Sequence, residues 1–331
     1  MHLERPKHIA LISPVYNDWK SFIVLAREIQ ATINRSEASI DIFAIDDSST
    51  EDSREIIDSV NDLHIGISLV RLSCNLGHQR AIAVGLSLVN ELDYDAVIVM
   101  DSDGEDLPSD IPAMLHAHDD NPDAIIVARR AQRSEGRVFR SGYVAFKMVF
   151  RILTGKVIDF GNFCLIPRRR VNQLTSMSEL WNHLAATIVR AKIPLVRLST
   201  KRGTRYAGRS HMSVVTLVQH GISAMSVFGD VLFVRLSVLA GLLLTAAIAV
   251  ATTALIIRLF STLAVPGWAT LVVGLSALAI VQALSSLLVA TMLAMSNRST
   301  YTFIPKLHAK SFVDQIITLG SNEQRVHLRG V

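Results

Sequence analysis

Residues 9–128 alternate between short apolar runs and segments with helical spacing. The apolar runs, each short enough for a buried strand, cover residues 9–13, 40–45, 67–72, 96–100 and 124–128. In the segments between them, apolar residues recur at helical intervals, and these segments cover residues 20–33, 53–60, 79–92 and 111–117. Strands that are apolar throughout and alternate with helices are typical of a mostly parallel sheet covered on both faces. We therefore predict a Rossmann-like α/β domain, whose ligands bind beyond the carboxyl ends of the strands.

The hydrophobic pattern changes after about Val231. Residues 236–257 and 268–295 carry no charged side chain, and Arg258 and the turn at Pro266-Gly267 separate the two runs. The first run would extend roughly 33 Å as a helix, which is enough to cross a bilayer. A pair of buried core helices is the alternative, but a soluble core rarely needs two such stretches. We therefore predict two transmembrane helices.

These patterns divide the chain into four parts: the α/β domain at 1–211, a juxtamembrane segment at 212–230, two transmembrane helices at 231–296 and a tail at 297–331. The juxtamembrane segment mixes apolar residues with Gln219 and His220, so it fits either a helix lying on the bilayer or a core helix of the α/β domain. Lysines and arginines follow the second span, whereas the loop between the spans carries only Arg258. This asymmetry predicts that both termini and the α/β domain are cytosolic.

Composition agrees with a membrane protein. Of the 331 residues, 50% are hydrophobic and 19% are charged, which is too apolar for an ordinary soluble protein. The net charge of +4 would suit nucleic acid, anionic lipid or a phosphorylated substrate. Cys74 and Cys164 lack metal-ligand spacing, so we expect reduced thiols in a cytosolic domain. The apolar run at 9–15 is too short for a secretory signal.

Asp101-Ser102-Asp103 comes directly after the fourth predicted strand. Two carboxylates one residue apart at a strand end can hold Mg²⁺ or Mn²⁺ together with a diphosphate. The metal would then neutralise charge on a departing diphosphate. An Asp-x-Asp pattern is also common in solvated loops, so its position after a buried strand is what favours the metal.

Other polar segments follow the first three strands. Asp46-Asp47 ends the second strand, where a carboxylate can accept hydrogen bonds from a ribose or base; a capped, solvated turn is the alternative. Tyr16 follows the first strand and could line a base pocket or belong to a plain loop. After the third strand, the segment at 75–80 leads into a helix whose N-terminus, with Arg80, favours anions.

Two basic stretches are candidates for phosphate binding, with a solvated basic surface as the alternative reading. The first follows the fifth strand and comprises Arg129, Arg130, Arg133, Arg137 and Arg140. The second lies close to the first span and comprises Arg202, Arg205, Arg209, Ser210 and His211.

As a set, these motifs resemble the family 2 inverting glycosyltransferases of the GT-A fold, especially the polyprenyl-phosphate glycosyltransferases such as dolichyl-phosphate mannose synthases and bactoprenol glucosyl transferases. The resemblance covers roughly residues 8–300. It rests on the segments 13–17, 45–49, 75–77, 101–103 and 159–163, on Arg205-x-x-Gly208-x-Ser210, and on the C-terminal helix pair.

The resemblance implies that Tyr16, Asp46 and Asp47 contact the nucleoside, and that arginines handle the phosphates. With the motifs above, the residues expected to bind the donor, its phosphates or the acceptor phosphate are Pro14, Tyr16, Asn17, Asp46, Asp47, Gly77, Gln79, Ser102, Glu105, Arg129, Arg140 and His211. The residues expected to act in catalysis are Asp101, Asp103, Asp159 and Arg205, and the first two of these are also the expected Mg²⁺ or Mn²⁺ ligands.

Three positions depart from the family's usual pattern. Asn17 is followed by Asp18 rather than Glu, and His211 stands where many members carry Lys. Asn162 stands where many members carry Asp, and an amide cannot act as a general base; Asp159 is a possible substitute. A phosphate acceptor is already anionic at pH 7 and needs little deprotonation, so Asn162 mildly favours a phosphate over a hydroxyl acceptor.

The expected function is transfer of one sugar from a UDP- or GDP-sugar to undecaprenyl or dolichyl phosphate, with inversion, at the cytosolic face of a membrane (the inner membrane in a bacterium). A homo-oligomer is compatible with this reading. One alternative is a glycosyltransferase acting on a glycan or lipid hydroxyl, and another is an inactive membrane scaffold. A nucleic-acid partner is disfavoured, because the basic residues are not interleaved with aromatics.

Overall fold

A computed structural model describes residues 7–33, 38–51, 59–60, 62–130, 147–207, 214–260, 267–299 and 302–319. The chain divides into two compact units. The sheet unit comprises Met1–Phe146, Lys156–Val227 and Thr302–Val331, and the hairpin unit comprises Lys147–Gly155 and Phe228–Tyr301. Each unit is described by itself.

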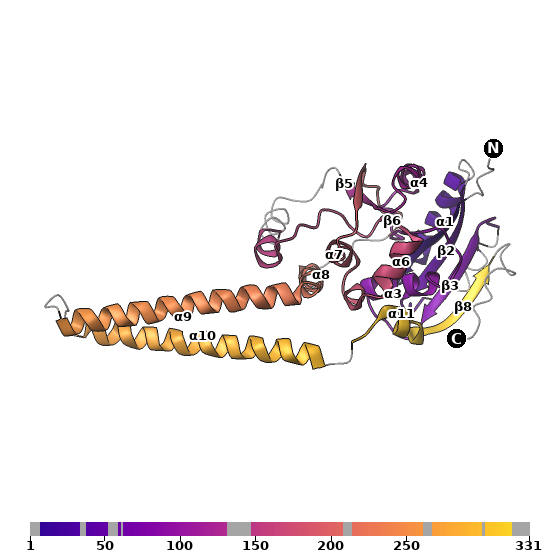
Figure 1. The fold of residues 1–331 in the computed structure, drawn as a ribbon. Helices are drawn as coiled ribbons and strands as arrows, with labels where there is room; N and C mark the ends of the chain where they lie inside the picture. Colours follow the sequence, from indigo (N-terminus) through magenta and orange to yellow (C-terminus); the bar gives the residue numbers. More distant parts are fainter. Residues whose placement is uncertain are drawn as a thin grey trace. The chain divides into compact units, whose positions relative to one another are not determined.

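The sheet unit is built on one sheet (Figure 1), in which the described residues form eight strands in the order β7-β5-β6-β4-β1-β2-β3-β8. β1 pairs in parallel with β2 and β4, β2 with β3, and β5 with β7. β6 runs antiparallel between β4 and β5, and β8 runs antiparallel beside β3. The strands are β1 (His8–Val15), β2 (Ser39–Asp46), β3 (Gly66–Leu72), β4 (Ala96–Val99), β5 (Ile125–Arg130), β6 (Cys164–Pro167), β7 (Leu195–Thr200) and β8 (Val313–Leu319).

Helices cover both faces of this sheet because alternate side chains of each strand point to opposite faces. Two separate apolar clusters result, one that includes α3 and one that includes α1 and α4. The α3 layer packs so closely that a Cβ at Gly85 would lie 2.7 Å from Cγ2 of Ile12. The helices of this unit are α1 (Trp19–Ile33), α3 (His78–Val89), η1 (Pro108–Asp110), α4 (Ile111–Asp120), α6 (Arg168–Thr175), η2 (Ser178–Trp181), α7 (Leu184–Arg190), α8 (Val214–Ser226), α11 (Pro305–His308) and η3 (Ala309–Phe312).

The predicted α/β fold with a mostly parallel sheet is confirmed, and the five predicted strands correspond to β1–β5. The predicted helix at 53–60 falls mostly outside the described residues. The antiparallel strand β6 is a difference from the sequence expectation. β8 is a second difference, because part of the segment expected as a tail joins the sheet beside β3.

The hairpin unit contains two long helices, α9 (Gly229–Phe260) and α10 (Trp268–Ser299). Their most apolar stretches have mean hydropathies of 2.3 and 2.2, so both are long and apolar enough to cross a membrane. Both helices carry exposed leucines along their length, including Leu242 and Leu278. This exposure distinguishes them from the core helices of a soluble protein, which are mostly buried.

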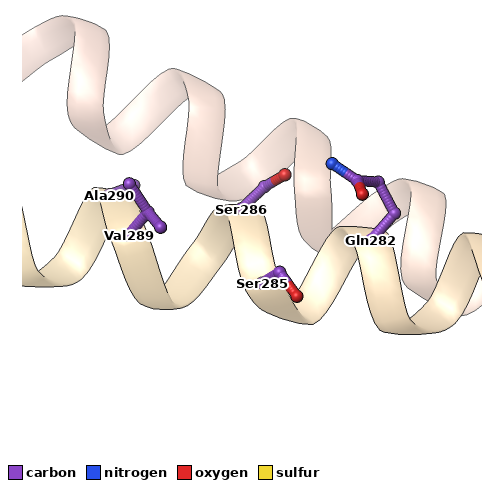
Figure 2. A pocket seen from close by; sticks show the side chains of 5 residues that line it. All are labelled: Gln282, Ser285, Ser286, Val289 and Ala290. Carbon is purple, nitrogen blue, oxygen red and sulfur yellow. The ribbon is translucent and has the colours of Figure 1, made fainter.

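An open groove of about 350 Å³ lies on α10, lined by Gln282, Ser285, Ser286, Val289 and Ala290. Figure 2 shows these side chains along the helix. The Ser285 hydroxyl donates to the Val281 carbonyl of its own helix at 2.8 Å, as serines in apolar helices commonly do. The groove belongs to the hairpin unit and holds none of the charged residues described below.

Candidate active site

The polar motifs gather at the carboxyl ends of the parallel strands β1 to β5, which lie along one side of the sheet. β6 is antiparallel to β4 and β5, so it begins at this edge rather than ending there. The residues just before Cys164 therefore lie at the same edge as those just after Val99. We call this side of the sheet, at the carboxyl ends of β1 to β5, the functional edge. Asp101 and Asn162 both lie here although 61 positions of sequence separate them.

Asp103 lies in the loop after β4 and is held by two contacts. Its Oδ1 accepts from the backbone N–H of Glu105 at 2.9 Å, and its Oδ2 accepts from the Arg205 guanidinium at 2.7 Å. Burial raises the pKa of the Asp103 carboxyl, and the Asp101 carboxylate raises it further, while Arg205 has the opposite effect. The site thus crowds carboxylates that a cation would stabilise.

The loop after β7 folds onto the loop that carries Asp103. Backbone N–H groups of Gly203 and Tyr206 donate to the carbonyls of Glu105 and Asp103 at 2.9 and 3.0 Å. The approach is so close that a Cβ at Gly203 would lie 2.1 Å from the Gly104 carbonyl oxygen. Only glycine fits at this crossing, which fixes the arginines on either side of it.

Those arginines are Arg202 and Arg205. Arg202 donates to Oε1 of Glu105 at 2.6 Å, and Arg205 lies 3.7 Å from the same oxygen while it binds Asp103. A guanidinium presents several N–H donors in a fork, so each arginine can hold a carboxylate and still offer donors to a phosphate. The structure thus joins two motifs that the sequence presented separately.

The ends of β1 and β2 are tied to each other by short hydrogen bonds. Asp46 Oδ1 accepts from the Ser49 backbone at 2.8 Å, and Ser49 Oγ accepts from the Asn17 backbone at 2.9 Å. Asn17 Oδ1 in turn accepts from the Thr50 backbone at 2.9 Å. Asn17 and Ser48 have φ values of 49° and 60°, a left-handed conformation that asparagine tolerates well. Asp46 and Asn17 therefore shape these loops.

Asp47 binds the segment that precedes α3. Its two carboxylate oxygens accept from the backbone N–H groups of Leu76 and Gly77 at 2.7 and 2.8 Å. Burial raises the pKa of Asp47 despite these bonds, which act in the opposite direction. Gly77 has φ of 88°, which favours glycine. These two bonds hold the start of α3 against the end of β2.

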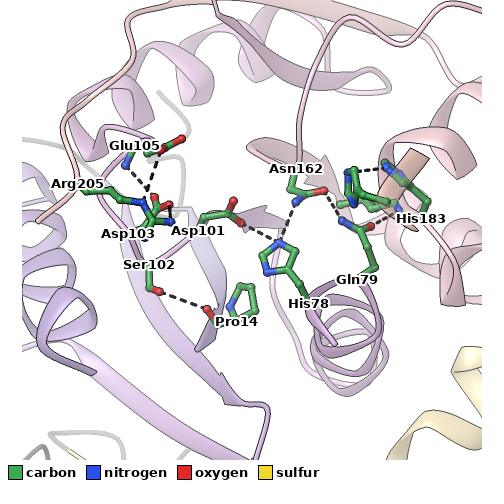
Figure 3. A network of polar contacts seen from close by, with 12 residues as sticks. Pro14, His78, Gln79, Asp101, Ser102, Asp103, Glu105, Asn162, His183 and Arg205 are labelled. Atoms are coloured by element: carbon green, nitrogen blue, oxygen red, sulfur yellow. Dashed lines mark hydrogen bonds and ion pairs between the residues drawn. The ribbon is translucent and has the colours of Figure 1, made fainter. Parts of the chain in front are cut away.

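Tyr16 and Pro14 also lie at the functional edge. The Tyr16 side chain is 50% exposed, which leaves its ring available to a base. The Pro14 carbonyl accepts from the hydroxyl of Ser102 at 3.4 Å, which ties the end of β1 to the loop after β4 (Figure 3).

A second polar group meets Asp101 from the side of α3 and β6. Nε2 of His78 lies 3.2 Å from Oδ1 of Asp101 and 2.9 Å from Nδ2 of Asn162. Asn162 also contacts Gln79, whose Nε2 lies 3.0 Å from Asn162 Oδ1. In Figure 3, Asp101 lies between this group and the Asp103–Arg205 pair. Burial opposes protonation of His78, but Asp101, Asp103 and Asp47 together raise its pKa.

His78 was not among the residues expected in the site. The segment at 75–80 was expected to bind anions through its helix N-terminus and Arg80, but no sequence pattern links His78 to Asp101. In the structure Arg80 lies over the Trp181 ring, 5.6 Å from its centroid, in a cation–π contact.

Asp159 lies between two arginines. Arg197 of β7 donates to its two oxygens at 3.2 and 3.3 Å, and Arg129 of β5 lies 3.5 Å from Oδ2. Arg197 was not among the expected residues, because β7 was not predicted. With both of its oxygens bonded to a cation, Asp159 is better suited to orient arginines than to remove a proton.

Two histidines meet beside Gln79. His183 caps α7 through Nδ1, which accepts from the Ala186 backbone at 3.3 Å, and its Nε2 lies 3.0 Å from Nε2 of His220 on α8. Burial, and then the charges of His220 and His78, lower the pKa of His183 to about 3. The pKa of His220 is also lowered, mainly by burial. Both rings are therefore neutral at pH 7.

The donor set suits a divalent metal only in part. In the described part of the chain, no group of three or more His, Cys, Asp or Glu side chains could by itself hold a metal ion. Asp101 and Asp103 are nevertheless oxygen donors of the kind that Mg²⁺ and Mn²⁺ prefer. Diphosphate oxygens commonly complete the coordination of such ions, so a pair of carboxylates fits a metal that arrives with its nucleotide. Arg140 and His211 lie outside the described residues.

The chain belongs to glycosyl transferase family 2, whose profile matches residues 10–180. It is similar to the undecaprenyl-phosphate 4-deoxy-4-formamido-L-arabinose transferases of Yersinia pestis (strain Pestoides F) and Yersinia pseudotuberculosis serotype O:3 (strain YPIII). Each is 27% identical over 174 residues, which are 52% of this chain and 52% of the relative. The chain thus spans about half the length of the curated relatives it matches.

Among solved structures, the chain is similar to glucosyl-3-phosphoglycerate synthase from Mycobacterium tuberculosis in complex with Mn²⁺, UDP and phosphoglyceric acid. The TM-score is 0.50 at 13% identity, over 68% of this chain and 78% of that one. At this identity the likeness shows the fold alone, and it agrees with the GT-A architecture expected from the sequence.

Proposed function

We propose that this protein transfers a sugar from a nucleoside diphosphate sugar to a polyprenyl phosphate, with inversion at the anomeric carbon. The observation that carries the proposal is the pairing of Arg205 with Asp103 and of Arg202 with Glu105, in the loop that also carries Asp101 at the functional edge. Membership of family 2 supports sugar transfer, and the two apolar helices support a lipid acceptor. The names of the curated relatives support a polyprenyl phosphate.

In this proposal the nucleoside lies over the ends of β1 and β2, against Tyr16 and the loops that Asp46 and Asp47 hold in place. The diphosphate lies near Arg202 and Arg205, which stabilise its growing charge as it leaves. Asp101 and Asp103 would hold Mg²⁺ or Mn²⁺, which supplies further charge neutralisation on the diphosphate. Asp159 keeps Arg129 and Arg197 in place for a phosphate.

We further propose that the sheet unit is cytosolic. The chain leaves this unit at Val227 and re-enters it at Thr302, and β8 then pairs with β3. A chain that returns to the same sheet crosses a bilayer an even number of times. The lysines that follow α10, Lys306 and Lys310, favour the cytosolic side. A reporter fused after Val331 should be active in the cytosol, and activity only on the opposite side would contradict the two-span arrangement.

A transfer assay tests the proposed reaction. Purified full-length protein is incubated with undecaprenyl phosphate in detergent and a panel of radiolabelled UDP- and GDP-sugars, with Mn²⁺ or Mg²⁺ present. We expect chloroform-extractable label from one donor, and its loss with excess EDTA. Label that appears only on a glycan or a lipid alcohol would show that the acceptor is a hydroxyl rather than a polyprenyl phosphate. Absence of any transfer across the panel would favour the inactive scaffold.

A further inference from the structure

Gln79 carries two hydrogen bonds that fix which way its amide points. The backbone N–H of Leu184, the first residue of α7, lies 2.8 Å from Oε1 of Gln79. A backbone N–H can only donate, so the Gln79 atom facing it must be the oxygen. The Gln79 amino group must then face Asn162, 3.0 Å away.

The orientation of the Gln79 amide in turn fixes the orientation of the Asn162 amide. The Gln79 amino group can only donate, so the Asn162 atom that faces it is the oxygen, and the Asn162 amino group faces Nε2 of His78 at 2.9 Å. Amide orientations are usually ambiguous, because oxygen and nitrogen look alike. Here the Leu184 backbone fixes both amides, and Nε2 of His78 then accepts from Asn162 and carries no proton. Asn162 therefore presents N–H donors toward the His78–Asp101 side of the site.

The neighbouring carboxylates at this edge are engaged by other groups. Asp103 accepts from Arg205, Asp159 is bonded to Arg197, Asp47 accepts from two backbone amides, and Asp101 lies 3.2 Å from Nε2 of His78. An acceptor that approaches Asn162 thus meets a hydrogen-bond donor, and an amide cannot take up a proton. A hydroxyl acceptor would need a base, whereas a phosphate monoester is already ionised near neutral pH.

We propose that Asn162 selects an acceptor that arrives as a phosphate monoester anion, and that Gln79 is the positioning residue that turns the Asn162 amino group toward it. The inference rests on the proposed sugar transfer and specifies its acceptor. The phosphate oxygen forms the bond to the anomeric carbon as the bond from that carbon to the donor diphosphate breaks. The nucleoside diphosphate leaves with that electron pair, and no proton is removed from the acceptor.

Gln79→Glu tests the positioning role with almost no change in size. The carboxylate introduced by this substitution still accepts from Leu184, but its other oxygen cannot donate to Asn162. The Asn162 amide should then turn over, so that its oxygen faces the acceptor. We expect the KM for undecaprenyl phosphate to rise about 10- to 100-fold, the range for a hydrogen bond to a charged group. Gln79 contacts Asn162 and Leu184 rather than the Asp103–Arg205 pair, so the KM for the sugar donor should change less than the acceptor KM.

Two further variants separate orientation from added charge. Gln173→Glu adds the same charge on α6, which follows the opposite end of β6, and should behave as wild type. Gln79→Met removes the amide without adding charge, and should raise the acceptor KM by less than Gln79→Glu does. Equal acceptor KM values for Gln79→Glu, Gln79→Met and Gln173→Glu would overturn the positioning role.

The acceptor panel tests the selecting role of Asn162. Wild type should use undecaprenyl phosphate and leave undecaprenol, which has the same chain with a hydroxyl, unmodified. Asn162→Asp should raise the KM for undecaprenyl phosphate, because it replaces a donor by a negative charge. The inference would be overturned if the KM of Asn162→Asp for undecaprenyl phosphate were equal to or lower than that of wild type. It would also be overturned if wild type used undecaprenol better than undecaprenyl phosphate.

A binding measurement keeps this inference separable from the proposed function. The stabilisation of detergent-solubilised protein by undecaprenyl phosphate, undecaprenol or glycerol 3-phosphate is measured by thermal shift without any donor. Tighter binding of the phosphate lipid to wild type than to Gln79→Glu supports the inference even if no sugar is transferred. Tighter binding of glycerol 3-phosphate than of undecaprenyl phosphate would support a phosphate monoester acceptor but show that it is not a polyprenyl lipid. Equal binding of the phosphate and the alcohol would contradict the inference.

Discussion

The two edges of the sheet use their polar residues differently. At the edge opposite the functional edge, Asp41 Oδ2 lies 2.9 Å from both His8 Nε2 and the Tyr94 hydroxyl. The rings of His8 and Tyr94 lie 4.4 Å apart, and the His8 backbone donates to Asp95 at 2.8 Å. The partners of these polar groups are supplied within the cluster, which joins the starts of β1 and β2 to the residues before β4.

The functional edge instead brings like charges together. The pKa of Asp103 is raised, by burial and by Asp101. Such crowding is unfavourable for folding and useful for binding a charged ligand. The edge at Asp41 therefore contributes mainly stability, and the functional edge contributes mainly chemistry.

The largest effect should come from Asp103→Asn. The variant removes a ligand charge from a site that must offset a diphosphate, so turnover should fall on the order of 1,000-fold. Asp314→Asn on β8 makes the same chemical change on an exposed side chain and should leave turnover intact. Sugar-transfer rates and thermal unfolding of both variants provide the measurement. Turnover near that of wild type in Asp103→Asn would remove this residue from the site.

Gly203→Ala should also act on the functional edge. Its Cβ would lie 2.1 Å from the Gly104 carbonyl oxygen, so the loops that carry Arg205 and Asp103 would separate. Displacement of catalytic groups by about 1 Å can lower turnover on the order of 100-fold. Gly274→Ala on α10, where a Cβ meets nothing within 4 Å, is the control. Equal turnover of the two variants would show that the loop crossing does not matter to the reaction.

The third prediction concerns pH and His183. Its pKa is about 3 in the folded protein and near 6.5 in the unfolded chain, so the unfolded chain binds the proton first as pH falls. The stability contributed by the neutral ring is complete above pH 6.5 and is lost as pH falls from 6.5 toward 3. At pH 5 the loss should be about 2 kcal/mol.

His183→Asn isolates that contribution, because asparagine can still cap α7 but does not titrate. Urea unfolding of detergent-solubilised protein at pH 7.5 and pH 5.0 measures the difference. The variant should lose less stability than wild type over this range. Parallel losses in the two proteins would show that His183 is not held neutral by the fold.

The smallest effect should come from Tyr94→Phe at the opposite edge. The variant removes the hydroxyl that donates to Asp41, and the free energy of unfolding should fall by about 1–2 kcal/mol. Sugar-transfer kinetics should be unchanged, because the residue lies at the other end of the strands. If Tyr94→Phe lowered turnover and left the free energy of unfolding unchanged, the edge at Asp41 would not have the stabilising role assigned to it.

The alternation of strands and helices, the two apolar helices and the carboxylates at strand ends could all be predicted from the sequence. Each of these depends on local spacing: a buried strand or helix shows its period within a few residues, and Asp46 or Asp101 is placed by the strand directly before it. The family resemblance added the GT-A fold, which the structure and the family profile confirm.

Which distant segments meet at the functional edge depends on the tertiary fold. The antiparallel direction of β6 places Asn162 beside His78 and Asp101, and β7 brings Arg197 to Asp159. The return of β8 to β3 follows both long helices in the chain. Strand order and direction depend on pairing between segments far apart in sequence, and a local hydrophobic period carries no information about the partner. The orientation of Asn162 likewise depends on a backbone N–H at Leu184, which no side-chain pattern reveals.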